Sequence, residues 1–332
     1  MEIRLGDDIL NEKRILEKIE EILQELPPYV EDYFLSRTLS TSPLTRLNYA
    51  YDLRLFFSFI FSYLEKEEGE EVTLGDLGKL KGRDIERYVV FLKKKNGEKG
   101  VARKLSSLSS FFGYFVKHDD MPRNPCNLVE KPKAHSNEII YLTPDEVVEF
   151  LNVIEFGSPS FSPKQKEYWE KTRKRDLAIA YVFLSTGIRV SELASLNFSD
   201  IDLKECKLHI RRKGGNKNFV PLGDEAIPSI KEYMKERGEE EGPFFVSTQK
   251  KRMSSQTLEN LIEKYAKLAG IQKKITPHKL RKTFGTSMYR ETKDIYVVAG
   301  ILGHRNVATT TKHYAAQTED TIMGVRNKVK LK

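Results

Sequence analysis

The sequence predicts a mainly α-helical protein of two domains, with a small antiparallel β-sheet in the second. Its 332 residues suffice for about two domains of ordinary size. Apolar residues recur at helical spacing along much of the chain, and no strand pattern occurs in the first 130 residues. Two β-like runs, Lys207–Arg212 and Asn218–Leu222, flank a glycine-containing turn, which is the pattern of a hairpin. The expected parts are a helical domain at 1–130, a linker at 131–142 and an α+β domain at 143–332.

Four helices are expected in the first domain. Apolar residues of 9–26 repeat with a helical period, and Pro27-Pro28 ends that helix. A second helix begins at Ser42-Pro43, because serine caps a helix and proline suits its first position. The remaining features are expected at 65–71 (an acidic loop), 83–95 (a helix), 96–97 (an Asn-Gly turn) and 100–117 (a helix).

The second domain begins with a strong helix-start signal. Thr143 can cap the helix while Glu146 reaches back to the Thr143 backbone, which is a capping box. A helix near 173–186 is expected to end at Gly187. Further helices are expected at about 226–236, 255–268, 277–290 and 293–301, and 244–246 could add a strand.

Positive charge is concentrated after the first 78 residues. The whole chain carries a net charge of +8. Residues 1–78 hold 8 basic and 17 acidic residues, whereas 79–117 hold 11 basic and 3 acidic ones. Residues 134–332 hold 34 basic and 25 acidic residues. The net charge suits a polyanionic partner, and the positive charge begins at Lys79 and continues through the C-terminal half.

Nothing in the sequence indicates a membrane segment or a disulfide framework. The longest apolar run, Leu177–Leu184, is too short to span a bilayer. The first residues lack the apolar stretch of a signal peptide, so we expect a cytoplasmic protein without a membrane partner. The two cysteines, Cys126 and Cys206, have no metal-ligand spacing and are interpreted as structural thiols.

Basic residues mark the start of the helix expected at 277–290. Thr276 and Pro277 predict a helix start, and His278 and Arg281 fall in its first turn. Free N–H groups there favour an anion, and an always-charged arginine beside a histidine suits a phosphate. A solvated surface helix is the alternative for this segment alone.

A second arginine follows the most apolar helix of the chain. Gly187 permits a sharp turn, Arg189 starts the next helix, and Glu192 lies three residues further on. The carboxylate of Glu192 could fix the guanidinium group by a bidentate contact. A purely structural ion pair is the alternative.

Three more residues complete an ordered set of chemical groups. Lys213 lies at the hairpin tip, with Lys217 as its rival, and a solvated turn lysine is the alternative. His304 lies in a short turn, and Tyr314 follows ten residues later. A phenol with a pKa of about 10 needs a proton acceptor to attack near neutral pH, and His278 or His304 could serve. Together the set suits attack on a phosphodiester without metal, although Tyr314 alone could be a packed aromatic residue.

The ordered motifs TGIRVSEL, RRKGGNKNFVPL, TPHKLRKTFGT, LGH and KHY resemble those of the tyrosine recombinase (phage integrase) family. Residues 143–332 are similar to its catalytic domain, and about 29–130 to its helical core-binding domain, the latter through Thr45–Phe59, Ala102–Ser106 and Asn124-Pro125. The layout and length look most like single-chain Xer recombinases. The hairpin reads KGGNK where many relatives have KGNK, which leaves Lys213 and Lys217 as alternatives.

The resemblance implies a role for each motif residue. Tyr314 would form a 3′-phosphotyrosyl bond, and Arg189 and Arg281 would bind the non-bridging oxygens of the phosphate. Lys213 would protonate the leaving 5′-oxygen, and His278 would be the general acid/base. His304 would donate a hydrogen bond to the phosphate, and Glu192 would support the first arginine. No cofactor or metal is implied.

The resemblance also implies partners. These are double-stranded DNA with a pseudo-palindromic site, a homotetramer on DNA formed from a free monomer or weak dimer, and a possible DNA translocase as activator. The last segment, 318–332, would dock on a neighbouring subunit. Chromosome dimer resolution at a dif-like site is the expected role, with an integrase or transposase of a phage or conjugative element as alternative. A type IB topoisomerase and a DNA-binding protein without chemistry are further alternatives.

DNA contacts are also expected from the first domain. Arg46, Arg103 and Lys104 lie on predicted helices whose opposite faces are apolar, so they should point away from the core. We interpret them as phosphate or base contacts, with a solvated helix face as the alternative. If they contact phosphates, replacing one should lower the salt slope of binding by about one unit.

Overall fold

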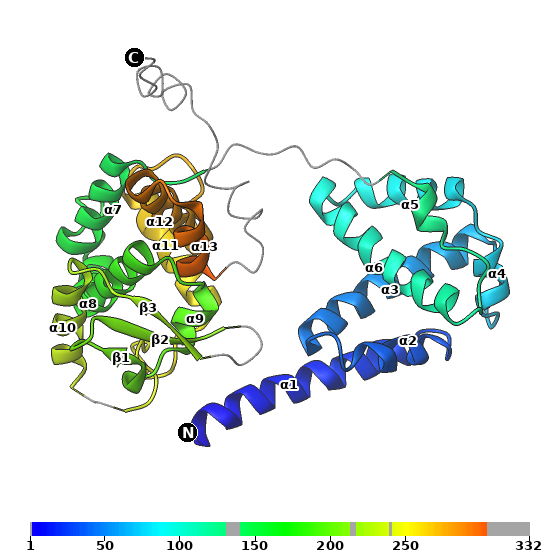
Figure 1. Cartoon of the computed structure of the whole chain (residues 1–332), viewed down its shortest axis with the longest axis horizontal. Coiled ribbons are helices and arrows are strands. Elements are labelled where there is room, and N and C mark those ends of the chain that lie inside the picture. The colour runs from blue at the N-terminus through cyan, green and yellow to red at the C-terminus, as the bar shows by residue number, and fades with distance from the viewer. Residues whose placement is uncertain (1, 131–139, 213–216, 239–240, 304–332) are drawn as a thin grey trace, which may run out of the picture. The chain divides into compact units, whose positions relative to one another are not determined.

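A computed structural model describes residues 2–130, 140–212, 217–238 and 241–303 (Figure 1). The chain divides into two compact units, residues 1–137 and 138–332, and each is described by itself. Within the described ranges no helix is long and apolar enough to cross a membrane. The predicted site residues Lys213, His304 and Tyr314 lie outside the described residues.

The first unit is a helical bundle around an aromatic core. Helix α1 packs along α3, and α3 packs on α6 (Figure 1). Phe56 makes edge-to-face contacts with Tyr88 and Phe112, with ring centroids 5.2 and 5.8 Å apart. The elements are α1 (Glu2–Leu23), α2 (Val30–Arg37), α3 (Pro43–Tyr63), α4 (Leu74–Gly78), α5 (Gly82–Lys93), α6 (Glu98–Lys117) and the 3₁₀ helix η1 (Pro125–Leu128).

The starts of the helices in this unit agree only in part with the prediction. Ser42 caps α3 as predicted, and its hydroxyl accepts a hydrogen bond from the Thr45 N–H at 3.3 Å. Helices α2 and α4 were not predicted, because eight and five residues are too few to show a helical period. Helix α1 also begins earlier than the predicted residue 9.

The second unit combines helices with a three-stranded antiparallel sheet of order β1-β2-β3, which lies at the end of the unit away from α7 (Figure 1). Its register pairs His209 with Phe219 and Arg211 with Lys217. The elements are α7 (Pro144–Phe156), α8 (Pro163–Thr186), α9 (Val190–Ser195), η2 (Phe198–Asp200), β1 (Ile201–Asp202), β2 (Lys207–Arg211), β3 (Lys217–Pro221), α10 (Ala226–Arg237), α11 (Ser255–Leu268), α12 (Pro277–Thr292) and α13 (Ile295–Leu302).

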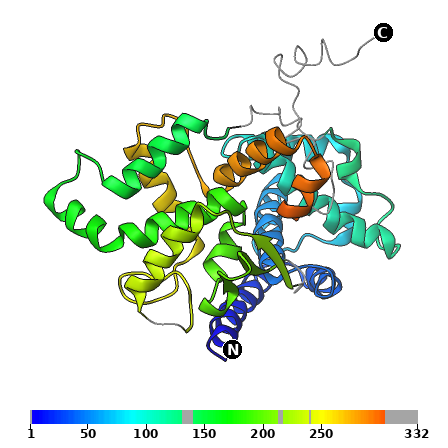
Figure 2. The same cartoon turned by 60° about the vertical axis from the view of Figure 1, so that its left-hand side comes forward.

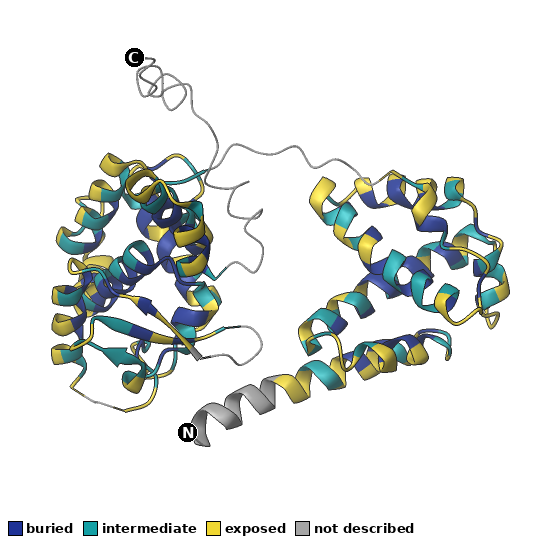
Figure 3. Ribbon diagram, viewed as in Figure 1, coloured by how far each residue is buried: buried dark blue, intermediate teal, exposed yellow. Residues whose placement is uncertain are grey.

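The predicted hairpin and the Thr143 capping box are both present. The Glu146 N–H donates to the Thr143 hydroxyl at 3.3 Å, and the Thr143 N–H donates to the Glu146 carboxylate at 2.7 Å. Helix α8, however, begins ten residues before the predicted 173. Its first half is charged and mostly exposed, with Trp169 and Thr172 buried but no continuous apolar stripe, whereas its second half is mostly buried (Figure 3).

The strand suggested at 244–246 does not form among the described residues. Val246 makes one isolated bridge with Arg252, and Pro243 makes another with Asn197. The Tyr233 hydroxyl donates to the Phe244 carbonyl at 3.1 Å and accepts from the Val246 N–H at 3.2 Å. A side chain therefore satisfies backbone groups that a strand partner would otherwise occupy.

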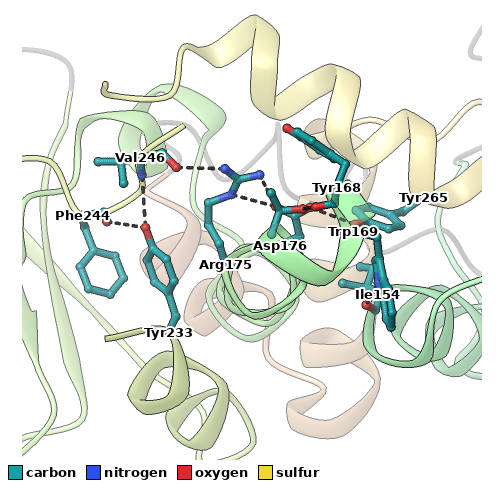
Figure 4. A network of polar contacts seen from close by, with 10 residues as sticks. Ile154, Tyr168, Trp169, Arg175, Asp176, Tyr233, Phe244, Val246 and Tyr265 are labelled. Carbon is teal, nitrogen blue, oxygen red and sulfur yellow. Dashed lines mark hydrogen bonds and ion pairs between the residues drawn. The ribbon is translucent and has the colours of Figure 1, made fainter. Parts of the chain in front are cut away.

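A buried polar network holds the middle of α8 (Figure 4). Asp176 is fully buried, and its Oδ1 accepts from Nε and Nη2 of Arg175 at 2.9 and 2.7 Å. Its Oδ2 accepts from the hydroxyls of Tyr265 and Thr172 at 2.9 and 3.2 Å. Burial, and then the nearby Asp176 charge, raise the pKa of Tyr265, so its hydroxyl stays a donor. The network holds α8 against α11 and therefore helps to fix the position of Gly187, which follows the last residue of α8.

Candidate active site

Gly187 ends α8 in a turn that only glycine fits. It adopts φ +60°, and its N–H donates to the Phe183 carbonyl at 3.0 Å. A Cβ at this position would lie 2.4 Å from Cδ1 of Phe284 and 2.9 Å from Cδ2 of Leu302. The end of α8 therefore touches both α12 and α13, which pack on one another (Figure 2).

Arg189 occupies the N-cap position of α9 and is held by Glu192. The Arg189 Nη1 donates to Oε1 of Glu192 at 2.8 Å, and the Arg189 N–H donates to Oε2 at 2.8 Å. The predicted pairing is present, but the second carboxylate oxygen binds the backbone and not the guanidinium fork. The Glu192 side chain is 5% exposed and that of Arg189 41% exposed, so a buried anion orients a partly exposed cation.

Arg281 is buried and joins two distant segments. Its Nη1 donates to the Gly187 carbonyl at 2.6 Å, and its Nη2 donates to the Leu302 carbonyl at 2.5 Å. Arg189 reaches the same place, because its Nη2 donates to the Gly303 carbonyl at 3.5 Å. The structure thus brings the two predicted arginines together at the end of α13.

His278 lies in the first turn of α12, three residues before Arg281, and is exposed. Thr276 occupies the N-cap position as predicted, but its side chain makes no capping hydrogen bond. The helix therefore starts at Pro277 without a side-chain cap. One helix turn thus carries an exposed imidazole and a buried guanidinium group.

Arg212 was not singled out from the sequence, yet it reaches the same turn. Its Nη2 donates to the Ile301 carbonyl at 2.6 Å, and its Nη1 to the Gly300 carbonyl at 3.4 Å. Burial, opposed in part by Glu192 and reinforced by Arg189, lowers the pKa of Arg212. In the sequence Arg212 is only the last, charged residue of a predicted strand, which gives no hint of a partner about 90 residues away.

The structure corrects the expected orientation of Arg46. This side chain is buried, and its Nη1 donates to the carbonyls of Thr38 and Thr41 at 3.2 and 3.1 Å. It closes the connection between α2 and α3, because the backbone carbonyls there need a donor. The prediction that Arg46 points away from the core was wrong.

Arg103 and Lys104 both pair with buried Asp52 of α3. Arg103 binds its two carboxylate oxygens at 2.5 and 2.8 Å, and the Lys104 Nζ lies 2.8 Å from Oδ1. The Lys104 side chain is only 14% exposed, so it also does not point away from the core, whereas Arg103 is half exposed. Contact with DNA stays a prediction for these residues, and Arg103 is the most accessible of them.

Comparison with known proteins places the chain in a wider context. A model of the phage integrase family matches residues 141–320, and a model of the phage integrase N-terminal SAM-like domain matches residues 29–118. A tyrosine recombinase XerC of Caldanaerobacter subterraneus subsp. tengcongensis is 34% identical over 86% of this chain and 82% of its own length. A XerC of Thermodesulfovibrio yellowstonii is 33% identical over 79% of this chain and 82% of its own length.

Solved structures share the fold. The XerH site-specific recombinase bound to a palindromic difH substrate matches with a TM-score of 0.68 at 19% identity, covering 86% of this chain and 80% of that chain. A lambda integrase fragment bound to a core site matches with a TM-score of 0.66 at 17% identity, covering 92% of this chain and 98% of that chain. At these identities the likeness shows the fold alone.

Proposed function

We propose that this protein exchanges DNA strands at a specific site through Tyr314. The premise is its family: the chain belongs to the phage integrase family and is a tyrosine recombinase. The observation that supports this most is the meeting of Arg281 and Arg189 at the carbonyls of Leu302 and Gly303, which directly precede His304 in the sequence. Two oriented guanidinium groups suit the two non-bridging oxygens of one phosphate.

In the proposed reaction, the hydroxyl oxygen of Tyr314 attacks the phosphorus of the scissile phosphodiester. The phenolic proton passes to His278 or His304, because a phenol with a pKa of about 10 is a poor nucleophile when protonated. Arg189 and Arg281 stabilise the negative charge that builds on the non-bridging oxygens. The P–O5′ bond breaks, Lys213 donates a proton to the leaving 5′-oxygen, and a 3′-phosphotyrosyl bond remains.

The second half of the reaction reverses the first on a new strand. The free 5′-hydroxyl of the partner strand attacks the phosphotyrosyl phosphorus and displaces Tyr314. One phosphodiester replaces another, so the exchange needs no nucleotide cofactor. Exchange of both strands requires several active sites on paired DNA, and we propose a tetramer on a pseudo-palindromic site.

The proposed biological role is resolution of chromosome dimers at a dif-like site, in the cytoplasm and with a DNA translocase as possible activator. Relatives named XerC and XerS support this assignment. Integration or transposition of a mobile element is the second candidate, since the fold is shared with lambda integrase and the Tn1549 transposon integrase. Deleting the gene would separate the two roles. Accumulation of multimeric chromosomes would support chromosome dimer resolution, whereas a mobile element that no longer moves would support integration or transposition.

Covalent capture tests the chemistry. Wild-type protein, Tyr314→Phe and a control, Tyr296→Phe, are each mixed with sheared host DNA and denatured in detergent, and the attached fragments are sequenced. Tyr296 is 72% exposed on α13, so its replacement removes a hydroxyl without disturbing the core. We expect one enriched sequence with the wild type and the control and none with Tyr314→Phe. Equal capture by Tyr314→Phe would refute the assignment of the nucleophile.

A separate assay distinguishes a recombinase from a topoisomerase. Wild-type protein that exchanges strands between two DNA sites but does not relax supercoiled DNA would exclude a topoisomerase.

A further inference from the structure

The end of α13 has an unusual set of hydrogen-bond donors. The last carbonyls of a helix have no partner within the helix and need donors from elsewhere. Here the four consecutive carbonyls of 300–303 all accept from arginine side chains, and that of Gly300 also accepts from the Gly303 N–H at 3.0 Å. Arg212 donates to the carbonyls of Gly300 and Ile301. Arg281 donates to the carbonyl of Leu302, and Arg189 donates to that of Gly303. One short turn thus joins three guanidinium groups.

Shape as well as hydrogen bonding fixes Arg212 in this turn. Gly303 adopts φ +64°, where residues with a side chain are strained. A Cβ on Gly303 would lie 1.9 Å from Nη1 and 2.2 Å from Cζ of Arg212. The guanidinium group therefore lies directly against the Gly303 backbone, in space that only a glycine leaves open.

Arg212 reaches the turn from a different layer of the unit. Arg211 and Lys217 form the last pair of the β2–β3 ladder, so Arg212 is the first residue beyond it. The hydrogen bonds of its side chain join the end of strand β2 to the end of α13. Movement of the α13 end relative to the sheet would break these bonds.

This arrangement is poor for stability alone. The Nε of Arg212 is buried and has no acceptor among the described residues, and a buried donor without an acceptor is unfavourable. A second cation, Arg189, lies close enough to lower the pKa of Arg212. The hydrogen bonds of Arg212 to the α13 carbonyls indicate what this strained group does.

We propose that Arg212 is a positioning residue for phosphate binding, which holds the α13 end so that the carbonyls of Leu302 and Gly303 fix the guanidinium groups of Arg281 and Arg189. Arg212 itself need not touch the DNA. The inference rests on the proposed function, because it assigns the phosphate to those two arginines.

The test compares Arg212→Met with Arg211→Met. Both variants remove one positive charge from adjacent residues, but Arg211 is exposed on β2 and donates to no α13 carbonyl that the structure records. The probe is a duplex with the captured site, made once with the natural scissile phosphate and once with a methylphosphonate there. The methylphosphonate lacks the negative charge that the arginines would stabilise, so their placement should matter less.

We expect Arg212→Met to form the covalent complex about 10- to 100-fold more slowly than Arg211→Met on natural DNA, with equal DNA affinity, since losing one well-placed donor costs about 10²–10³ in rate and this effect is indirect. On the methylphosphonate the difference should fall to a few-fold. Equal rates for the two variants, or the same loss on both substrates, would overturn the inference.

Gly303→Ala gives a second route that keeps Arg212. The added methyl group would displace the guanidinium, so this variant should show the same substrate-dependent loss. Combining it with Arg212→Met should cause less than the product of the two losses, because both changes break one contact. Independent, fully multiplicative losses would contradict the contact. Failure of the wild-type protein on both substrates would overturn the proposed function itself, whereas an active wild type with an unaffected Arg212→Met would overturn only the positioning role.

Discussion

Replacing Asp176 by asparagine tests whether the polar network of α8 is as buried as the structure shows. The substitution keeps the size of the side chain and removes its charge. Arg175, whose side chain is 7% exposed, would then keep its charge with no carboxylate beside it. Removing one partner of a buried ion pair typically costs about 3–5 kcal/mol, which is a large part of the 5–15 kcal/mol that stabilises an ordinary domain.

Two comparisons sharpen the Asp176 prediction. Glu167→Gln breaks another ion pair on α8, between Glu167 and Lys171, whose side chains are both 66% exposed. This control should leave the stability almost unchanged, because water screens an exposed pair. The double variant Arg175→Met, Asp176→Leu removes both buried charges and should recover much of the lost stability.

Urea unfolding followed by tryptophan fluorescence suits this assay. The chain has one tryptophan, Trp169, which is buried in α8 and donates to the Ile154 carbonyl at 2.8 Å (Figure 4). Its emission therefore reports on the second unit. A loss below about 1 kcal/mol for Asp176→Asn, similar to that of Glu167→Gln, would refute the reasoning.

Three further predictions concern single residues. Gly187→Ala should cost more than about 2 kcal/mol, measured by the same unfolding assay, because it combines a left-handed φ with a contact to Phe284 at 2.4 Å; an unchanged midpoint would contradict the turn. Burial raises the pKa of Glu146, but hydrogen bonds from the Lys273 Nζ and the Thr143 N–H outweigh it and hold that pKa below its ordinary value. The stabilisation is therefore complete above the unfolded pKa and is lost as pH falls through the folded one, so Glu146→Gln should cost about 1 kcal/mol at pH 7 and progressively less below about pH 4 in urea titrations. Arg46→Met should cost about 2–3 kcal/mol by circular dichroism and leave the salt slope of DNA binding unchanged; a slope lowered by about one unit would restore Arg46 as a phosphate contact.

Local sequence signals predicted the helices that carry the site. The capping box at Thr143, the Ser42-Pro43 start and the turn at Gly187 each depend on residues within four positions of one another. The pairing of Arg189 with Glu192 is equally local, at three residues. Such contacts are fixed by helix geometry and are therefore legible in the order of residues.

The partners of Arg281 and Arg46 could not be found in this way. Both arginines bind backbone carbonyls, which every residue has, so no side-chain type marks the acceptor. Arg46 lies opposite an apolar helix face and still turns inward, because the α2–α3 connection needs a donor there. The first half of helix α8 was missed for another reason. It is charged and has no apolar stripe, so its sequence shows no helical period.

The sequence by itself determined the class of fold, the family and the chemical groups, because these reside in residue types, their order and their short-range spacing. Only the tertiary structure decided that Arg189, Arg212 and Arg281 meet at one turn. The acceptors there are backbone carbonyls at the end of α13, and their nearness to strand β2 and helix α8 depends on packing between elements up to about 110 residues apart in the chain. Contacts of that kind are set by burial of the whole core, which no local pattern of residues encodes.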